Sequence, residues 1–516
     1  MESLCGAASA PCVKGVRMQF IPSLTEMQAL TSQGNLCPLY TEIAADLETP
    51  VSAYLKTAQG PWTFLLESVE GGQHLARYSF IGTEPYLTLR MSEGKAHAVQ
   101  AGYKQTIAYD DPLELLQSYL SDYRPVRLPD LPRFVGGAVG YMAYETVCNF
   151  ERIPRPAHCD YEMPDAMWQF VDTLLVFDHV RHRIKVISHV HLDAADLALE
   201  YERVTAKIRT IVARLRQPLP AGMALQEGEA GTPVVPTSNV SLGEYVERVL
   251  HAKEYITAGD VFQVVPSQRF SRPVKTDPFT VYRALRTVNP SPYMFYVTGP
   301  DGILVGASPE LLVRVEEGVV TTHPIAGTVP RGKTPEEDEA LSQQLLHDEK
   351  EKAEHLMLVD LGRNDIGRVS KPGTVKVPRF MQVEKFSHVQ HLVSHVTGEL
   401  RDDMRGIDAL RACFPAGTVS GAPKIRAMQI IAELEQSRRG VYAGAVGHLG
   451  FNGDLDTCIA LRTIVIVNGI AYVQAGGGVV ADSDPEMEYR ESCNKAAAPL
   501  RALELADRFS TEGGVA

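Results

Sequence analysis

The sequence lacks the features of membrane proteins, zinc proteins and disulfide-stabilised proteins. No apolar run approaches the length of about 20 residues that a membrane-spanning helix needs, and the N-terminal MESLCGAASAPCVKG has no signal-peptide core. The eight cysteines are dispersed without a C-x-x-C pair. We therefore expect a cytoplasmic protein with reduced, mostly structural thiols and no membrane partner.

Positive charge is also scarce. The chain has 50 Lys and Arg residues against 63 Asp and Glu residues, a net charge of -13. Binding to a nucleic-acid backbone needs clustered positive charge, so we expect no nucleic-acid partner. An anionic metabolite can still bind where a few basic side chains and a metal ion reverse the local field.

The length of 516 residues suits two domains or one domain with a large extension. Residues 217–240 are rich in Pro, Gly, Thr and Ser and have little apolar periodicity, which is typical of a linker. We therefore expect an N-terminal accessory domain at 1–216 and a catalytic domain at 241–516.

Apolar patterning predicts strands and helices in both halves. The predicted strands are 62–68, 135–144, 173–177, 261–270, 293–298, 303–307, 459–467 and 471–475, and the predicted helices are 195–216, 243–258, 336–359, 422–435 and 485–505. Helices do not separate the strands regularly, so we expect an α+β fold of antiparallel sheets rather than a doubly wound sheet.

Two Glu-x-x-Glu pairs lie in predicted helices. Glu351 with Glu354, and Glu488 with Glu491, each place two carboxylates on one helix face. Such pairs could supply oxygen ligands to Mg²⁺. An isolated pair of this kind more often faces solvent, so the spacing alone leaves both interpretations open.

Six ordered motifs give the sequence its specific character. They are ASPE (307–310), HPIAGTVPRG (323–332), EHLMLVDLGRND (354–365), HLVSHVTGEL (391–400), GTVSGAPK (417–424) and DLDTCIALRT (454–463). Together they closely resemble the chorismate-utilising enzymes, and LLES (65–68) resembles the accessory domain of anthranilate synthase component I. The resemblance implies two antiparallel sheets packed as a sandwich, with helices outside and two intimately associated regions.

Two positions distinguish between members of this family. In the family that this sequence resembles, aminodeoxychorismate synthases typically have Lys at the position of Ala326. The members that add water to chorismate have a basic Lys at the position of Gln263. An amide cannot deprotonate water. The resemblance therefore implies that ammonia adds to chorismate and anthranilate forms, with aminodeoxychorismate synthase, or a non-catalytic tryptophan sensor, as the alternatives.

By resemblance, Glu354 and Glu491 hold Mg²⁺, with Glu351 and Glu488 as outer ligands. Glu310 is the candidate general acid for the departing C4 hydroxyl.

The remaining catalytic and substrate-binding candidates also follow from the resemblance. Thr328 is expected to bond the C4 hydroxyl beside Gly327, and His391 to assist proton removal from C2, although such a histidine is otherwise usually structural. Arg462 is expected to bind a substrate carboxylate. The rest of the pocket is assigned to Tyr442, Lys495, Gly476, Gly477 and Gly478.

The resemblance also implies a partner and an inhibitor. No G-x-C-x-G-x-Q string occurs, and Cys413 does not fit one, so a separate glutamine amidotransferase subunit is expected to supply ammonia in a heterotetramer of two copies of each chain. Tryptophan is expected to bind at Ser68, Pro292, Tyr293 and Met294, although SPY could instead be a structural turn.

Overall fold

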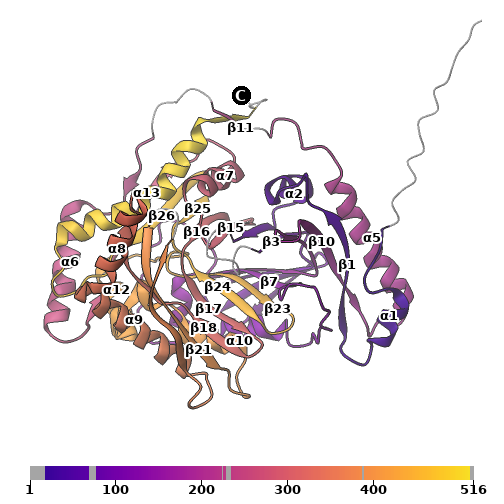
Figure 1. Ribbon diagram of the computed structural model, residues 1–516, viewed down its shortest axis with the longest axis horizontal. Helices are drawn as coiled ribbons and strands as arrows, with labels where there is room; N and C mark the ends of the chain where they lie inside the picture. The colour runs from indigo at the N-terminus through magenta and orange to yellow at the C-terminus, as the bar shows by residue number, and fades with distance from the viewer. Residues whose placement is uncertain (1–17, 69–76, 224, 228–233, 386–388, 512–516) are drawn as a thin grey trace, which may run out of the picture.

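The architecture is a sandwich of two large antiparallel sheets with helices on both outer faces (Figure 1). The computed structural model describes residues 18–68, 77–223, 225–227, 234–385 and 389–511. Every strand pairing described within the two large sheets is antiparallel, which confirms the predicted α+β class.

The first large sheet contains strands from both halves of the chain. Its order is β1 (Leu36–Ala44), β10 (Arg183–His191), β9 (Thr173–Asp178), β3 (Tyr78–Thr83), β2 (Thr63–Glu67), β15 (Tyr293–Gly299), β16 (Gly302–Ser308), β25 (Thr463–Val467), β26 (Ile470–Gly476), β14 (Ser267–Pro273) and β12 (Thr237–Ser238).

The second large sheet also contains strands from both halves of the chain. Its order is β19 (Ile325–Pro330), β21 (Val389–Glu399), β18 (Val319–Thr322), β17 (Leu311–Glu316), β24 (Leu455–Ile459), β23 (Ala445–Gly450), β7 (Gly137–Met142), β8 (Ala166–Val171), β4 (Leu87–Ser92), β5 (Lys95–Gln100) and β6 (Tyr103–Ala108), and β20 (Lys376–Lys385) also pairs with β21. Residues on both sides of the segment 217–240 therefore share both sheets.

Helices and two small ladders complete the fold. The helices are α1 (Leu24–Ala29), α2 (Pro50–Thr57), α4 (Pro112–Ser118), η1 (Tyr144–Asn149), α5 (Leu197–Leu215), α6 (Leu242–Thr257), α7 (Pro278–Val288), α8 (Pro335–His347), α9 (Glu349–Gly367), α10 (Gly406–Cys413), α11 (Gly417–Ser420), α12 (Lys424–Glu435) and α13 (Pro485–Arg508). The ladders pair β11 (Leu225–Glu227) with β27 (Phe509–Thr511), and β13 (Gln263–Val264) with β22 (Gly421–Ala422).

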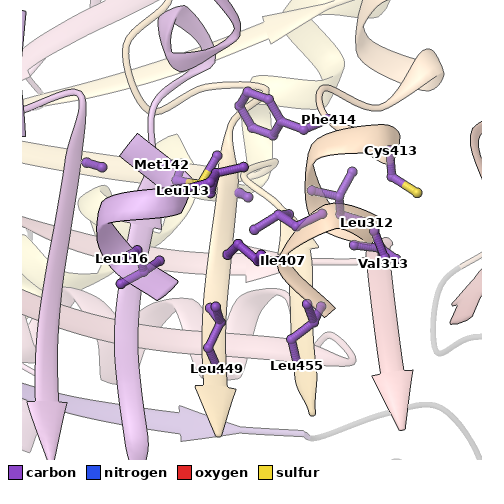
Figure 2. Packing of buried hydrophobic residues seen from close by; sticks show 14 of the residues in the cluster. Leu113, Leu116, Met142, Leu312, Val313, Ile407, Cys413, Phe414, Leu449 and Leu455 are labelled. Atoms are coloured by element: carbon purple, nitrogen blue, oxygen red, sulfur yellow. The ribbon is translucent and has the colours of Figure 1, made fainter. Parts of the chain in front are cut away.

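Three buried layers hold the sandwich together. Phe64, Phe295 and Tyr141 belong to the apolar layer between the sheets. A second layer lies under α5, α7 and α13. A third packs α4 and α10 against the second large sheet and includes Leu113, Met142 and Ile407 (Figure 2). Burial of this apolar surface is the main favourable contribution to folding.

Three predicted elements are interrupted. The predicted helix 336–359 breaks at Asp348, whose side chain accepts hydrogen bonds from the backbone N–H groups of Lys350 and Glu351 and so starts α9. The predicted strand 261–270 divides into β13 and β14, with Pro266, which has no N–H to donate, between them. The predicted strand 459–467 divides because the chain crosses between the sheets there, and Arg462 adopts a φ of 46°.

Candidate active site

The loop after β26 brings the two Glu-x-x-Glu helices to one place. A Cβ on Gly477 would lie 2.6 Å from Glu488 Oε2 on α13, and a Cβ on Gly478 would lie 2.5 Å from Gln263 Nε2. Gln263 Nε2 in turn donates a hydrogen bond of 3.1 Å to Glu354 Oε1 on α9. The glycines therefore allow the backbone to lie between the side chains from β13 and α13.

The four glutamates have an excess of negative charge. Burial raises the pKa of Glu351, and the charges of Glu354 and Glu491 raise it further. The carboxylates of α9 and α13 are therefore close enough to repel one another. The pKa of Glu488 is also raised, by burial and then by Glu491. Glu488 Oε2 is buried and has no hydrogen-bond partner among the described residues.

These side chains suit a hard divalent cation, although no group of three His, Cys, Asp or Glu side chains within the described residues is already arranged as a metal shell. The donors are carboxylate oxygens, which Mg²⁺ prefers, and their mutual repulsion would be offset by a cation. Lys495 Nζ supplies part of this compensation, because it lies 2.7 Å from Glu491 Oε1 and donates to the Gly476 carbonyl at 3.2 Å.

A second group is built by the pairing of β19 with β21. The register places Thr328 opposite His391, and Thr328 Oγ1 lies 3.1 Å from His391 Nδ1. The Gly327 carbonyl lies 2.9 Å from the same nitrogen. A carbonyl only accepts, so we assign the proton to Nδ1, which makes Nε2 the basic nitrogen.

Gly327 connects this group to the glutamates. Its φ is 66°, and a Cβ there would lie 3.0 Å from Glu351 Oε2. Burial lowers the pKa of His391, and the charge of Arg462 lowers it further, so the imidazole is neutral and Arg462 faces the same site.

Glu310 lies directly before β17 and is buried. Burial raises its pKa to about 8, although contacts with Thr418 and the charge of Lys495 act in the opposite direction. It lines a cavity of about 30 Å³ together with Thr418, Leu358 and Gly362. A carboxyl group in this environment keeps its proton at neutral pH and can act as an acid.

Arg462 and Tyr442 are the remaining candidate binding residues. Burial lowers the pKa of Arg462, which forms no ion pair with a carboxylate of the described residues and donates to Asn289 Oδ1 at 3.4 Å. Arg462 is half-buried, and a guanidinium without a carboxylate partner among the described residues favours an anionic ligand. Tyr442 is buried, and the backbone of Gly476 contacts its phenol.

The four residues assigned to tryptophan lie together elsewhere in the fold. The pairing of β2 with β15 sets Glu67 opposite Met294, which brings Ser68 beside the start of β15. Ser68 Oγ is buried and has no hydrogen-bond partner in the described ranges. Tyr293 Oη donates to Asp456 Oδ1 at 3.0 Å and so spans the two sheets.

Sequence reasoning did not assign several residues that the structure places at these sites. Thr418 lies in the quoted GTVSGAPK motif and contacts Glu310, whereas Asn289 lies two residues before the SPYM segment and contacts Arg462. Their place in or beside the quoted motifs indicated that they lie near the assigned site residues. Their contacts depend on loop conformations that residue patterns do not fix.

The model of the chorismate binding enzyme family matches residues 62–501. This chain belongs to that family. The chain is 46% identical to anthranilate synthase component 1 from Acetivibrio thermocellus, with 94% of the chain and 99% of the relative covered. It is 47% identical to anthranilate synthase component 1 from Pseudomonas aeruginosa, covering 94% and 99% respectively.

Solved structures of chorismate binding enzymes have the same fold. The crystal structure of anthranilate synthase component I from Streptococcus pneumoniae aligns with a TM-score of 0.75 at 39% identity and covers 89% of this chain and 99% of that one. The menaquinone-specific isochorismate synthase from Escherichia coli aligns with a TM-score of 0.66 at 20% identity, covering 93% and 98%, and supports the fold alone. No helix in the described ranges is long and apolar enough to cross a membrane.

Proposed function

We propose that this chain is the synthase subunit of an anthranilate synthase, converting chorismate and ammonia into anthranilate, pyruvate and water. The observation that carries the proposal is that Gln263 and the α13 glutamates meet at the glycine loop, while Gln263 bonds Glu354 of α9 and Gly327 connects Glu351 to His391. The full-length similarity to component 1 relatives supports the same reaction.

The glutamates are assigned to Mg²⁺ and to the ring carboxylate of chorismate. Glu354 and Glu491 would hold the ion, with Glu351 and Glu488 supporting it through water or hydrogen bonds. When bound, Mg²⁺ supplies positive charge that stabilises the ring carboxylate as electrons move toward it. Arg462 would bind the other carboxylate, on the enolpyruvyl group, with its planar guanidinium.

Proton transfers are assigned to Glu310 and His391, and a positioning role to Thr328. In the first step a C–N bond forms at C2 and the C4 hydroxyl leaves as water, taking its proton from Glu310, while Thr328 positions that hydroxyl. In the second step the C2 proton passes to His391 and the enolpyruvyl C–O bond breaks. The departing enolpyruvate takes up a proton to become pyruvate, and the ring becomes aromatic. His391 stands beside this step, and the Gly327 carbonyl orients its imidazole.

Gln263 supports ammonia as the nucleophile. Its amide is held by Glu354 and has no titratable proton, so the position offers no base for activating water. We infer that a glutamine amidotransferase subunit delivers the ammonia in a cytoplasmic heterotetramer, since the name component 1 of the relatives implies a second component.

Tryptophan is the proposed feedback inhibitor, bound by Ser68, Pro292, Tyr293 and Met294. Ser68 Oγ is buried and lacks a hydrogen-bond partner among the residues that the structure describes, which supports a ligand there. Asn289, three residues before Pro292, contacts Arg462 at 3.4 Å, so a ligand that shifts this segment would also shift the proposed carboxylate anchor.

The test is to incubate the purified chain with chorismate, ammonium and Mg²⁺ and to follow anthranilate fluorescence, with EDTA as the control. An amine product that retains its pyruvyl group would instead indicate aminodeoxychorismate synthase. Release of glutamate from glutamine by the isolated chain would contradict the separate amidotransferase subunit.

A further inference from the structure

A buried ion pair lies behind the proposed pocket and contacts its walls. Arg439 and Glu435 are 1% and 4% exposed. Arg439 Nε and Nη2 donate to the two Glu435 carboxylate oxygens at 2.9 and 2.6 Å. A buried pair of this kind contributes little net stability compared with apolar residues of similar volume, so its contacts need an explanation.

Two carbonyl contacts connect Arg439 to loops of the proposed site. Arg439 Nη2 donates to the Val265 carbonyl at 2.6 Å, two residues after Gln263. Arg439 Nη1 donates to the Val419 carbonyl at 2.7 Å, adjacent to Thr418, which contacts Glu310. One planar group therefore fixes the spacing between the loop of Gln263 and the loop behind Glu310.

Arg439 also stacks on two tyrosine rings, and its partner Glu435 contacts the strand that leads to the glycine loop. The Arg439 guanidinium lies 5.4 Å from the ring centre of Tyr442 and 4.8 Å from that of Tyr144. Glu435 Oε1 accepts from both the backbone N–H and the hydroxyl of Ser267 at 2.8 Å, and Ser267 pairs with Gly476 at the start of the glycine loop.

We propose that Arg439, acting with Glu435, is a positioning residue that holds Gln263, Tyr442 and the glycine loop at the spacing chorismate requires. This inference rests on the proposed function. Lysine would keep the charge at this position but lose the planar fork and the flat surface between the two rings. The general acid Glu310 and the pair Thr328 with His391 form no direct contact with Arg439 among the described interactions.

Arg439→Lys tests the proposal, with Arg272→Lys as the matched control. Arg272 is also a buried arginine paired with a carboxylate, Asp507, but it lies at the far end of β14 from the glycine loop. Loss of hydrogen bonds to a charged group is expected to raise the chorismate KM of Arg439→Lys by about tenfold or more, with kcat changed less than about threefold. Arg272→Lys should lower Tm comparably without changing KM.

A second variant and a second measurement cover failure to fold. Ser267→Ala removes one hydrogen bond from Glu435 without touching the ion pair, and a KM increase of about threefold or more is expected. The rise in Tm caused by chorismate should shrink in both variants, and it measures binding even if the wild-type chain forms no anthranilate. A chorismate response in Arg439→Lys equal to that of Arg272→Lys, or an unchanged one in Ser267→Ala when Arg439→Lys does not fold, would overturn the proposal.

Discussion

Replacing Glu310 with glutamine should remove the proton that the departing hydroxyl needs. With a pKa of about 8, the neutral form of Glu310 outnumbers the ionised form by about ten to one at pH 7, whereas an ordinary glutamate with a pKa of about 4.3 would be almost wholly ionised. General acid catalysis contributes about 10²–10⁴-fold, so kcat of Glu310→Gln should fall by that factor.

The pH profile gives an independent check. The acid form is required, so wild-type kcat/KM should fall about tenfold for each pH unit above about 8. The pKa of Glu310 in the folded state exceeds its value in the unfolded state, so its protonation stabilises the fold at low pH and this contribution is lost as pH rises through about 8. Glu310→Gln should therefore be at least as stable as the wild type at pH 9.

The assay is anthranilate fluorescence at saturating ammonium, with Glu316→Gln as the control. Glu316 is the last residue of β17, the strand that Glu310 directly precedes, and burial also raises its pKa, but it faces Arg133 rather than the pocket. Near-normal turnover in Glu310→Gln, or a flat profile between pH 7 and pH 9, would refute the assignment of Glu310 as the acid.

Two further predictions concern the inhibitor and the metal. Ser68→Leu should fill the proposed tryptophan site and raise the tryptophan concentration for half-inhibition by about tenfold or more, with uninhibited turnover near normal; unchanged inhibition would contradict the site. Glu354→Gln and Glu491→Gln should each lower turnover by about 10²-fold or more at saturating Mg²⁺, whereas Glu486→Gln, an exposed neighbour on α13, should have little effect. Retained turnover in either of the first two variants would remove the metal assignment.

Sequence reasoning was most successful where patterns are local or motifs are specific. The predicted helix 195–216 agrees with α5 to within two residues, because its apolar period and its Asp196 cap are local features. The sandwich itself followed from the motifs. Periodicity alone could not show that strands before and after 217–240 share both sheets, because strand pairing depends on distant contacts.

The ion pair between Glu435 and Arg439 shows where the sequence gives little information. The two residues are four apart, which on a helix usually indicates a solvent-exposed pair of small energetic value. Here the helix ends at Glu435 and the chain turns, so both side chains point into the interior. Only the packing of α12 against β13 and α11 shows that this pair, whose spacing is common on helix surfaces, is buried.

The shared sheets lead to a last prediction about residues 241–516. Without the N-terminal half, β15 would lose its pairing with β2 and β23 would lose its pairing with β7, and the apolar layer between the sheets would be opened. Long apolar edges of this kind promote aggregation, so a fragment of 241–516 should be insoluble or should melt without cooperativity, and co-expression with 1–240 should restore a soluble complex. A soluble, cooperatively melting fragment would contradict this. Ser68 directly follows β2, and Tyr293 begins β15, which pairs with β2. The proposed sensor and the proposed enzyme are therefore parts of one folding unit, and tryptophan would act on the sheet that also carries the glycine loop.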